Sequence, residues 1–177
     1  MRQAFVATAD LLLCIEAMSR KAFAVLLEAE MERTESVHLI TADLGFGVLD
    51  GVRSRFSERT YNTGAAEQLM LGIACGLADS GRVPVCYSIT PFLLYRPFEF
   101  LRTYVNHESI PVKLVGCGRD KDYSHDGVSH WADDDERVLA ALPNIRIFKP
   151  ADDKELELIW RDFLFSPGPA YLNLTRF

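Results

Sequence analysis

The sequence predicts an α/β fold, a mostly parallel sheet with helices covering both faces. Short apolar runs rich in β-branched residues recur along the chain, and segments of helical periodicity separate them. Strands that alternate with helices in this way are typical of parallel sheets buried on both faces. The 177 residues show no internal repeat or long linker, so we expect a single domain over residues 1–177.

The elements follow in order along the chain. Strands are expected at residues 37–42, 83–89, 112–117, 145–150 and 170–175, and helices at about 4–32, 65–80, 95–107, 133–142 and 151–165. In open parallel sheets, ligands bind where strands end and loops turn toward the next helix. Functional side chains are therefore expected in the segments "TADLGFG" (41–47), "SITPFLLYRPFEF" (88–100) and "GCGRDKDYSHDGVSH" (116–130).

Composition excludes several classes of protein. A formal net charge of -6 and a pI near 5.2 disfavour nucleic-acid binding, which needs a basic surface. No apolar run reaches the roughly 20 residues that span a bilayer, and no targeting segment is visible. The four cysteines lie in apolar segments without a CxxC spacing, which indicates reduced core thiols. We expect a soluble cytoplasmic protein, with the "DDDE" run at 133–136 as a solvated helix start.

Glu67 stands at the start of an otherwise apolar, glycine-punctuated helix. One interpretation is a first-turn acid that complements the helix dipole, with Thr63 or Gly64 near the N-cap. The other is a carboxylate in an apolar site, where a carboxyl group holds its proton more tightly and can hydrogen-bond a cofactor nitrogen. Glu67 alone does not decide between them.

Five segments occur together in one order: "TADLGFGVLDGV", "YNTGAAEQLMLGIACGLA", "TPFLLYRPFEFLR", "DGVSHWADDDERVLAALPNIRIFKPAD" and "YLNLTRF". This series resembles the pyrimidine-binding domain of transketolase-like enzymes that use thiamine diphosphate, over nearly the whole chain from about residue 35. The resemblance implies that Glu67 hydrogen-bonds the aminopyrimidine ring of the cofactor and promotes the tautomer that activates the thiazolium. It also implies that Phe92 and Tyr95 stack on that ring and that Asp43 lies near cofactor and substrate.

The same resemblance implies a substrate-binding role for three further residues. Asp126 and His130, in "DGVSH", match residues that face the sugar hydroxyls, with His130 able to relay a proton. Arg176, in "LTRF", matches an arginine that reaches a sugar phosphate. Gly47 and Gly118 stand where the family has a serine and a histidine near the phosphate, so the sequence leaves open whether the sugar is phosphorylated.

Ordinary structural roles compete with these assignments. Aromatic residues at helical spacing, such as Phe92, Tyr95 and Phe98, usually belong to a core, and Asp43 suits a turn at a strand end. His125 and His130 lack a third metal ligand at a suitable spacing, so no metal site is expected in this chain.

A thiamine diphosphate enzyme also needs Mg²⁺ and diphosphate ligands, typically a GDG motif followed by an asparagine, and this chain contains no GDG. The resemblance therefore implies a subunit of a split transketolase that lacks the third domain and transfers a two-carbon ketol unit. A partner chain, in a complex such as α2β2, would carry the diphosphate-binding domain and Mg²⁺. Three alternatives stay open: a carboligase similar to deoxyxylulose-phosphate synthase, a 2-oxo acid dehydrogenase beta-type subunit, and a noncatalytic regulatory partner.

Overall fold

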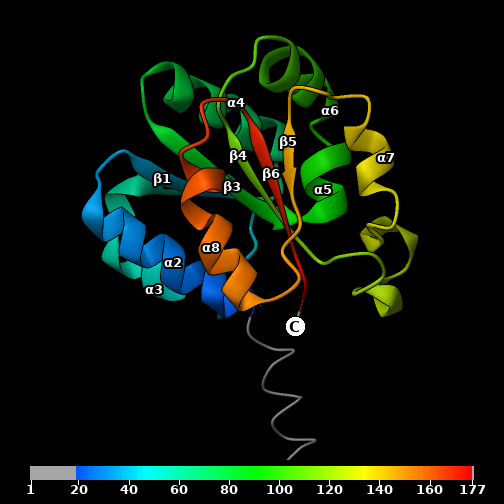
Figure 1. The fold of residues 1–177 in the computed structure, drawn as a ribbon, viewed down its shortest axis with the longest axis horizontal. Coiled ribbons are helices and arrows are strands. Elements are labelled where there is room, and N and C mark those ends of the chain that lie inside the picture. Colours follow the sequence, from blue (N-terminus) through cyan, green and yellow to red (C-terminus); the bar gives the residue numbers. More distant parts are fainter. Residues whose placement is uncertain (1–18, 177) are drawn as a thin grey trace, which may run out of the picture.

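A computed structural model describes residues 19–176 and shows a six-stranded parallel sheet (Figure 1). The strand order is β2-β1-β3-β4-β6-β5, and every neighbouring pair is parallel, with Leu39 opposite Val85, for example. This arrangement confirms the predicted α/β class. The strands are β1 (Val37–Thr41), β2 (Thr60–Asn62), β3 (Val83–Ile89), β4 (Lys113–Cys117), β5 (Arg146–Phe148) and β6 (Ala170–Leu174).

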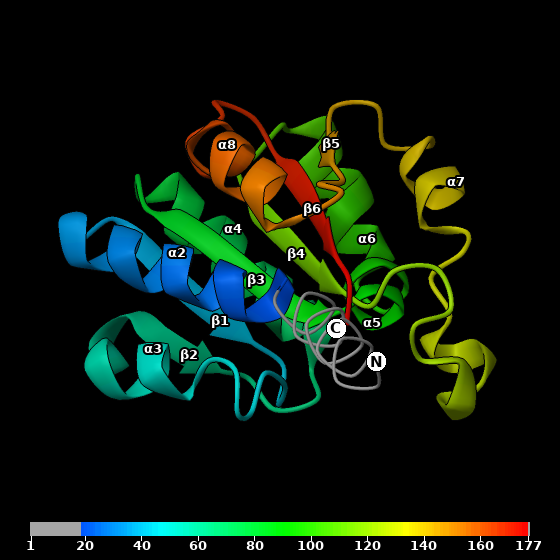
Figure 2. The same ribbon diagram turned by 60° about the horizontal axis from the view of Figure 1, so that its bottom comes forward.

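Helices cover both faces of the sheet (Figure 2). Side chains of α2, α3 and α8 pack on one face, and those of α4, α5 and α7 pack on the other. The helices are α2 (Ser19–Arg33), α3 (Asp50–Arg55), α4 (Glu67–Asp79), α5 (Thr90–Tyr95), α6 (Phe98–Phe100), α7 (Asp135–Leu139) and α8 (Asp153–Leu164), with a π-helical segment at Leu101–His107 and short 3-10 turns at Ser57–Arg59, Ser124–Asp126 and Val128–His130.

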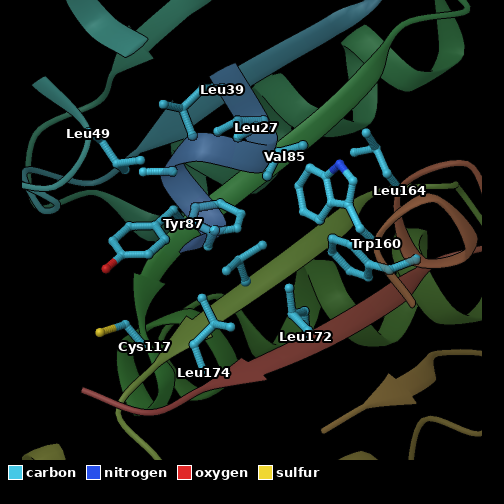
Figure 3. Close-up of a cluster of buried hydrophobic side chains, with 14 of the residues drawn as sticks. Leu27, Leu39, Leu49, Val85, Tyr87, Cys117, Trp160, Leu164, Leu172 and Leu174 are labelled. Carbon is cyan, nitrogen blue, oxygen red and sulfur yellow. The ribbon is translucent and has the colours of Figure 1, made fainter. Parts of the chain in front are cut away.

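The core on the α2 and α8 side is built around aromatic rings (Figure 3). Phe23 of α2 stacks on Tyr87 of β3 with ring centroids 5.7 Å apart, and it meets Trp160 of α8 edge-on at 5.8 Å. Figure 3 shows Tyr87 and Cys117 at one end of this cluster and Trp160 at the other. Burial of these side chains removes apolar area from water and fixes α2 and α8 against the sheet.

The structure differs from the predicted elements at several places. The helix expected at 4–32 is present from Ser19 onward, and residues 1–18 lie outside the described part. The helix expected at 95–107 begins only at Phe98, because Pro97 follows α5 and cannot donate a helical hydrogen bond, and it continues from α6 directly into the π-helical segment. Strand β2 was not predicted, since its three residues "TYN" contain no apolar run.

The prediction that the "DDDE" run is solvated is wrong for Asp135, whose surface is 4% exposed. Its carboxylate accepts hydrogen bonds from the Tyr171 hydroxyl at 2.9 Å and from the Asn173 side-chain amide, both on β6. These bonds join the start of α7 to the sheet. Burial, with the neighbouring Asp135 carboxylate, holds the pKa of Tyr171 well above its usual value, so the phenol stays neutral and donates.

Three of the four cysteines lie among the described residues, and Cys75, Cys86 and Cys117 are all buried free thiols, as expected. Cys14 lies outside them. Burial raises the pKa of Cys75 to about 11 and that of Cys86 further, which keeps both thiols protonated and unreactive. No helix within residues 19–176 is long and apolar enough to cross a bilayer.

Because all strands are parallel, their carboxyl ends meet at one edge, here called the carboxyl edge, where the chain also ends (Figure 1). The loop after β1, the helix α5 after β3 and the long loop after β4 all begin there. The segments that the sequence marked as functional are therefore neighbours in space.

Candidate functional site

Glu67 is the first residue of α4 and lies at the carboxyl edge with 3% of its surface exposed. The N-cap residue is Ala66, and no side chain caps the helix, so the expected capping by Thr63 or Gly64 is wrong. Thr63 instead directs its hydroxyl to the carbonyl of Thr41 at 3.3 Å. Acids are almost never fully buried without a partner, so this carboxylate requires a cation or a ligand beside it.

The partner of Glu67 is Arg96, which directly follows α5. Its Nη1 donates a hydrogen bond to Glu67 Oε1 at 2.7 Å. The same guanidinium carbon lies 3.6 Å from the centroid of the Phe92 ring, one helical turn earlier. Glu67 and Phe92, which the sequence predicted as cofactor ligands, are thus brought together, and Arg96 lies against both.

Sequence reasoning missed Arg96. The spacing of Phe92 and Arg96 was a usable signal, because residues four apart on a helix share a face. The ion pair with Glu67, 29 positions away, needed the packing of α4 and α5 on the same face of the sheet.

Phe92 also meets the loop after β4. The His130 ring packs edge-on against Phe92 with centroids 4.8 Å apart and at 67°. His130 also lies beside Tyr123, at 6.0 Å between centroids, and its Nδ1 is 3.0 Å from the Ser129 hydroxyl. The "DGVSH" loop therefore folds back over α5 and carries His130 to the predicted cofactor site.

Arg176 joins the same loop. Its guanidinium lies over the Tyr123 ring at 4.5 Å, and its Nη1 is 3.2 Å from His125 Nε2. That imidazole is 3.1 Å from the carboxylate of Asp126. A continuous series of contacts consequently runs from Glu67 through Phe92 and the loop to Asp126.

Tyr123 also has a second guanidinium nearby. Arg20, in the first turn of α2, is half-buried, and although burial lowers its pKa, the neighbouring Cys117, Tyr87 and Tyr123 raise it overall. Burial raises the pKa of Tyr123, and Arg20 and Arg176 act in the opposite direction. Tyr123, on the loop after β4, is therefore a neutral phenol close to two permanent cations, Arg20 and Arg176.

Two predicted cofactor ligands have hydrogen bonds elsewhere. The backbone amide of Asp43 donates to the Asn62 side chain at 2.8 Å, and Asp43 adopts a positive φ of 56°, as a turn residue does. The Tyr95 hydroxyl donates to Asp134 at the start of α7. Burial, followed by the bond to Asp134, raises the pKa of Tyr95.

Among residues 19–176, no three His, Cys, Asp or Glu side chains are grouped closely enough to hold a metal ion. The residues at the carboxyl edge do suit a planar, basic heteroaromatic ring. A buried carboxylate and an aromatic face already hold a planar cation between them, the guanidinium of Arg96.

Comparison with known proteins identifies the family of this chain. Residues 16–177 match the family model described as transketolase, pyrimidine binding domain. A putative transketolase C-terminal section from Methanocaldococcus jannaschii is 29% identical, over 89% of this chain and 50% of that protein. One of the subunits of an apulose-4-phosphate transketolase from Actinobacillus succinogenes is 34% identical, over 67% of this chain and 38% of that protein.

Among solved structures, a split-gene transketolase in the form of an inactive β4 tetramer superimposes with a TM-score of 0.78 at 28% identity. The match covers 89% of this chain and 51% of the other. The chain thus spans about half or less of each of these relatives. The family implies the use of thiamine diphosphate. Fold, motif order and sequence similarity together show that the chain belongs to the transketolase pyrimidine-binding domain family.

Proposed function

We propose that this chain provides the pyrimidine-binding half of a transketolase-like enzyme that transfers a two-carbon ketol unit between sugars. The observation that carries the proposal is Glu67, a 3% exposed carboxylate whose partner Arg96 lies on the face of Phe92. When bound, thiamine diphosphate supplies a nucleophilic thiazolium carbon that accepts the two-carbon unit.

In this proposal Glu67 binds the pyrimidine ring and shares a proton with its ring nitrogen. A buried carboxylate suits this task, because low local polarity strengthens the hydrogen bond and excludes competing water. Phe92 provides a flat apolar surface for the ring. Asp43 and Tyr95 are proposed as bordering cofactor ligands, with Asn62 and Asp134 fixing their positions.

Asp126, His130 and Arg176 are the proposed substrate ligands. Asp126 accepts hydrogen bonds from sugar hydroxyls, and His130, whose ring contacts Phe92, donates a proton to the reacting oxygen or takes one from it. Arg176 binds an anionic or polar end of the sugar. Gly118 has no side chain that could provide the extra phosphate ligand of the family, and a larger residue does not fit there because its Cβ would collide with the Tyr123 ring.

We further propose that a partner chain, in an α2β2 complex, holds Mg²⁺ and the diphosphate. The names of relatives called a C-terminal section, a transketolase subunit and a split-gene transketolase support this division. The expected partner has roughly 250 to 300 residues and carries GDG with a downstream asparagine.

The test is the substrate preference of the assembled complex. The chain is co-expressed with a GDG-containing chain from a neighbouring reading frame, and kcat/KM is measured for a ketose donor with an aldose acceptor and for pyruvate. Ketol transfer from the ketose supports the proposal. Efficient turnover of pyruvate without use of ketoses would instead favour a carboligase or 2-oxo acid dehydrogenase subunit. No turnover of either donor would favour the noncatalytic partner.

A further inference from the structure

We propose that Arg96 is an internal competitor of the cofactor: its guanidinium occupies the pyrimidine site of the free chain and must move away before the ring can bind. This inference rests on the proposed function, because it assigns an occupant to the same site. It concerns a residue that none of the sequence motifs singled out.

The geometry of Arg96 reproduces what a protonated aminopyrimidine would need. Both are planar cations with N–H groups in the plane. Arg96 donates to Glu67 Oε1 at 2.7 Å and places its guanidinium carbon 3.6 Å from the centroid of the Phe92 ring. A ring bound to this carboxylate and stacked on this face of Phe92 would overlap the guanidinium, so the two cannot be present together.

The exposures of the two partners show which one moves. The side chain of Glu67 is 3% exposed, whereas that of Arg96 is 46% exposed. Arg96 can therefore rotate into solvent, where a guanidinium is well hydrated, while the carboxylate stays in place. Because only the guanidinium occupies the site, rotation of the Arg96 side chain is sufficient to vacate it.

The arrangement has two consequences for the free chain. Glu67 keeps a charged partner, which avoids the large cost of an unpaired buried charge. Affinity for the pyrimidine is reduced by the fraction of molecules in which Arg96 is displaced. If that fraction is at most about 10%, removal of the guanidinium tightens binding about tenfold or more.

The first experiment measures binding of the isolated pyrimidine half of the cofactor, 4-amino-5-hydroxymethyl-2-methylpyrimidine, to the full chain by NMR titration. Arg96→Met removes the cation and keeps an unbranched side chain. Arg102→Met is the matched control, since Arg102 pairs with Glu99 at 2.9 Å on the surface. We expect Arg96→Met to bind the pyrimidine about tenfold or more tightly than wild type, and Arg102→Met to equal wild type.

A second measurement uses the wild-type chain and so does not depend on how well the variant folds. The Nε–H signal of the Arg96 side chain is expected to show the ring-current shift of Phe92, and to lose it as the pyrimidine is added. The signal of Arg102 should stay unchanged throughout the titration.

The outcomes separate this inference from the proposed function. Equal or weaker binding by Arg96→Met, or an Arg96 signal that stays shifted in the saturated complex, overturns the competition and leaves the pyrimidine site standing. If neither wild type nor Arg96→Met binds the pyrimidine, both the competition and the proposed pyrimidine site are overturned.

Discussion

At Glu67, a single guanidinium group, that of Arg96, pairs with a buried carboxylate at the start of an apolar helix. Glu67→Gln retains a carbonyl that can accept from Arg96 but removes the acid. We expect activity of the assembled complex to fall about 100-fold or more, in the range of acid–base contributions, while the melting temperature changes little. Arg96 is half-exposed and loses little when its partner becomes neutral. A melting temperature that falls in step with activity would instead favour a structural role in the helix.

Asp126 allows a test of the substrate side of the site. Asp126→Ala should lower kcat/KM for a ketose donor, because sugar hydroxyls lose their acceptor. The decrease should correspond to a loss of about 1 to 3 kcal/mol of transition-state stabilisation. Pyrimidine affinity should remain that of wild type, since the ion pair of Asp126 is with His125 and not with Arg96, the partner of Glu67. Asp133→Ala, which removes an exposed carboxylate paired with Lys121, is the control. Equal effects of the two substitutions on kcat/KM would contradict the assignment.

At this scale the sequence predicted Glu67, Phe92, Asp126, His130 and Arg176, and the structure links them by contacts. It could not predict Arg96, because the order of residues along a chain does not show which side chain fills the space beside a buried acid. Nor could it predict that the Tyr95 hydroxyl turns to Asp134, a contact that depends on where α7 packs.

Among the elements, α7 is joined to the sheet through the buried carboxylate of Asp135. Asp135→Ala leaves the Tyr171 hydroxyl and the Asn173 amide buried without their acceptor. We expect a loss of about 1 to 3 kcal/mol in the free energy of unfolding, measured with urea. Asp133→Ala should stay within about 0.5 kcal/mol of wild type. A similar small change for both would show that water replaces the buried acceptor.

Strand β4 begins with Lys113, whose ammonium donates to the carbonyls of Ser166 and Gly168, at 2.7 and 2.6 Å. Burial lowers the pKa of Lys113 from 10.5 to about 8. Between these values the unfolded chain binds more protons than the folded one, so this residue makes stability rise with pH. The unfolding free energy of wild type minus that of Lys113→Met should therefore increase from about pH 8 to pH 10, as measured in urea titrations.

The buried thiols act in the opposite direction above pH 9, because burial raises the pKa values of Cys75 and Cys86. Both thiols are present in wild type and in Lys113→Met, so their effects cancel in the difference between the two unfolding free energies. A difference that stays flat across this range would mean that Lys113 keeps its proton in the folded state.

The sequence predicted elements well wherever the apolar residues repeat at a clear helical or strand spacing. All five predicted strands exist, and α8 begins at the expected place, where Asp152 accepts from the amide of Glu155 at 2.8 Å. The failures have local causes. Pro97 interrupts a helical period that otherwise continues, and β2 is an edge strand too short to show alternation.

For the whole molecule, the proposed division of the active site predicts how stability responds to cofactor. Thiamine diphosphate with Mg²⁺ at 100 times its Kd should stabilise the assembled complex by about 2.7 kcal/mol. The same concentration should leave the melting temperature of this chain alone unchanged, because it provides only the pyrimidine side. Calorimetric titration of the chain with and without its partner gives the two affinities. Tight binding by the chain alone would refute the division.

Gly118 has a φ of +90°, and a Cβ at this position would collide with the ring of Tyr123. The two positions are therefore epistatic: a histidine at 118 is unacceptable until the ring at 123 is reduced, and reducing the ring first leaves a hole beside Cys117 and His130. Each single substitution is unfavourable, and even the pair leaves residue 118 in a backbone conformation that side chains rarely adopt. An engineer who wishes to extend the substrate range must change both positions in one step and rebuild the backbone turn.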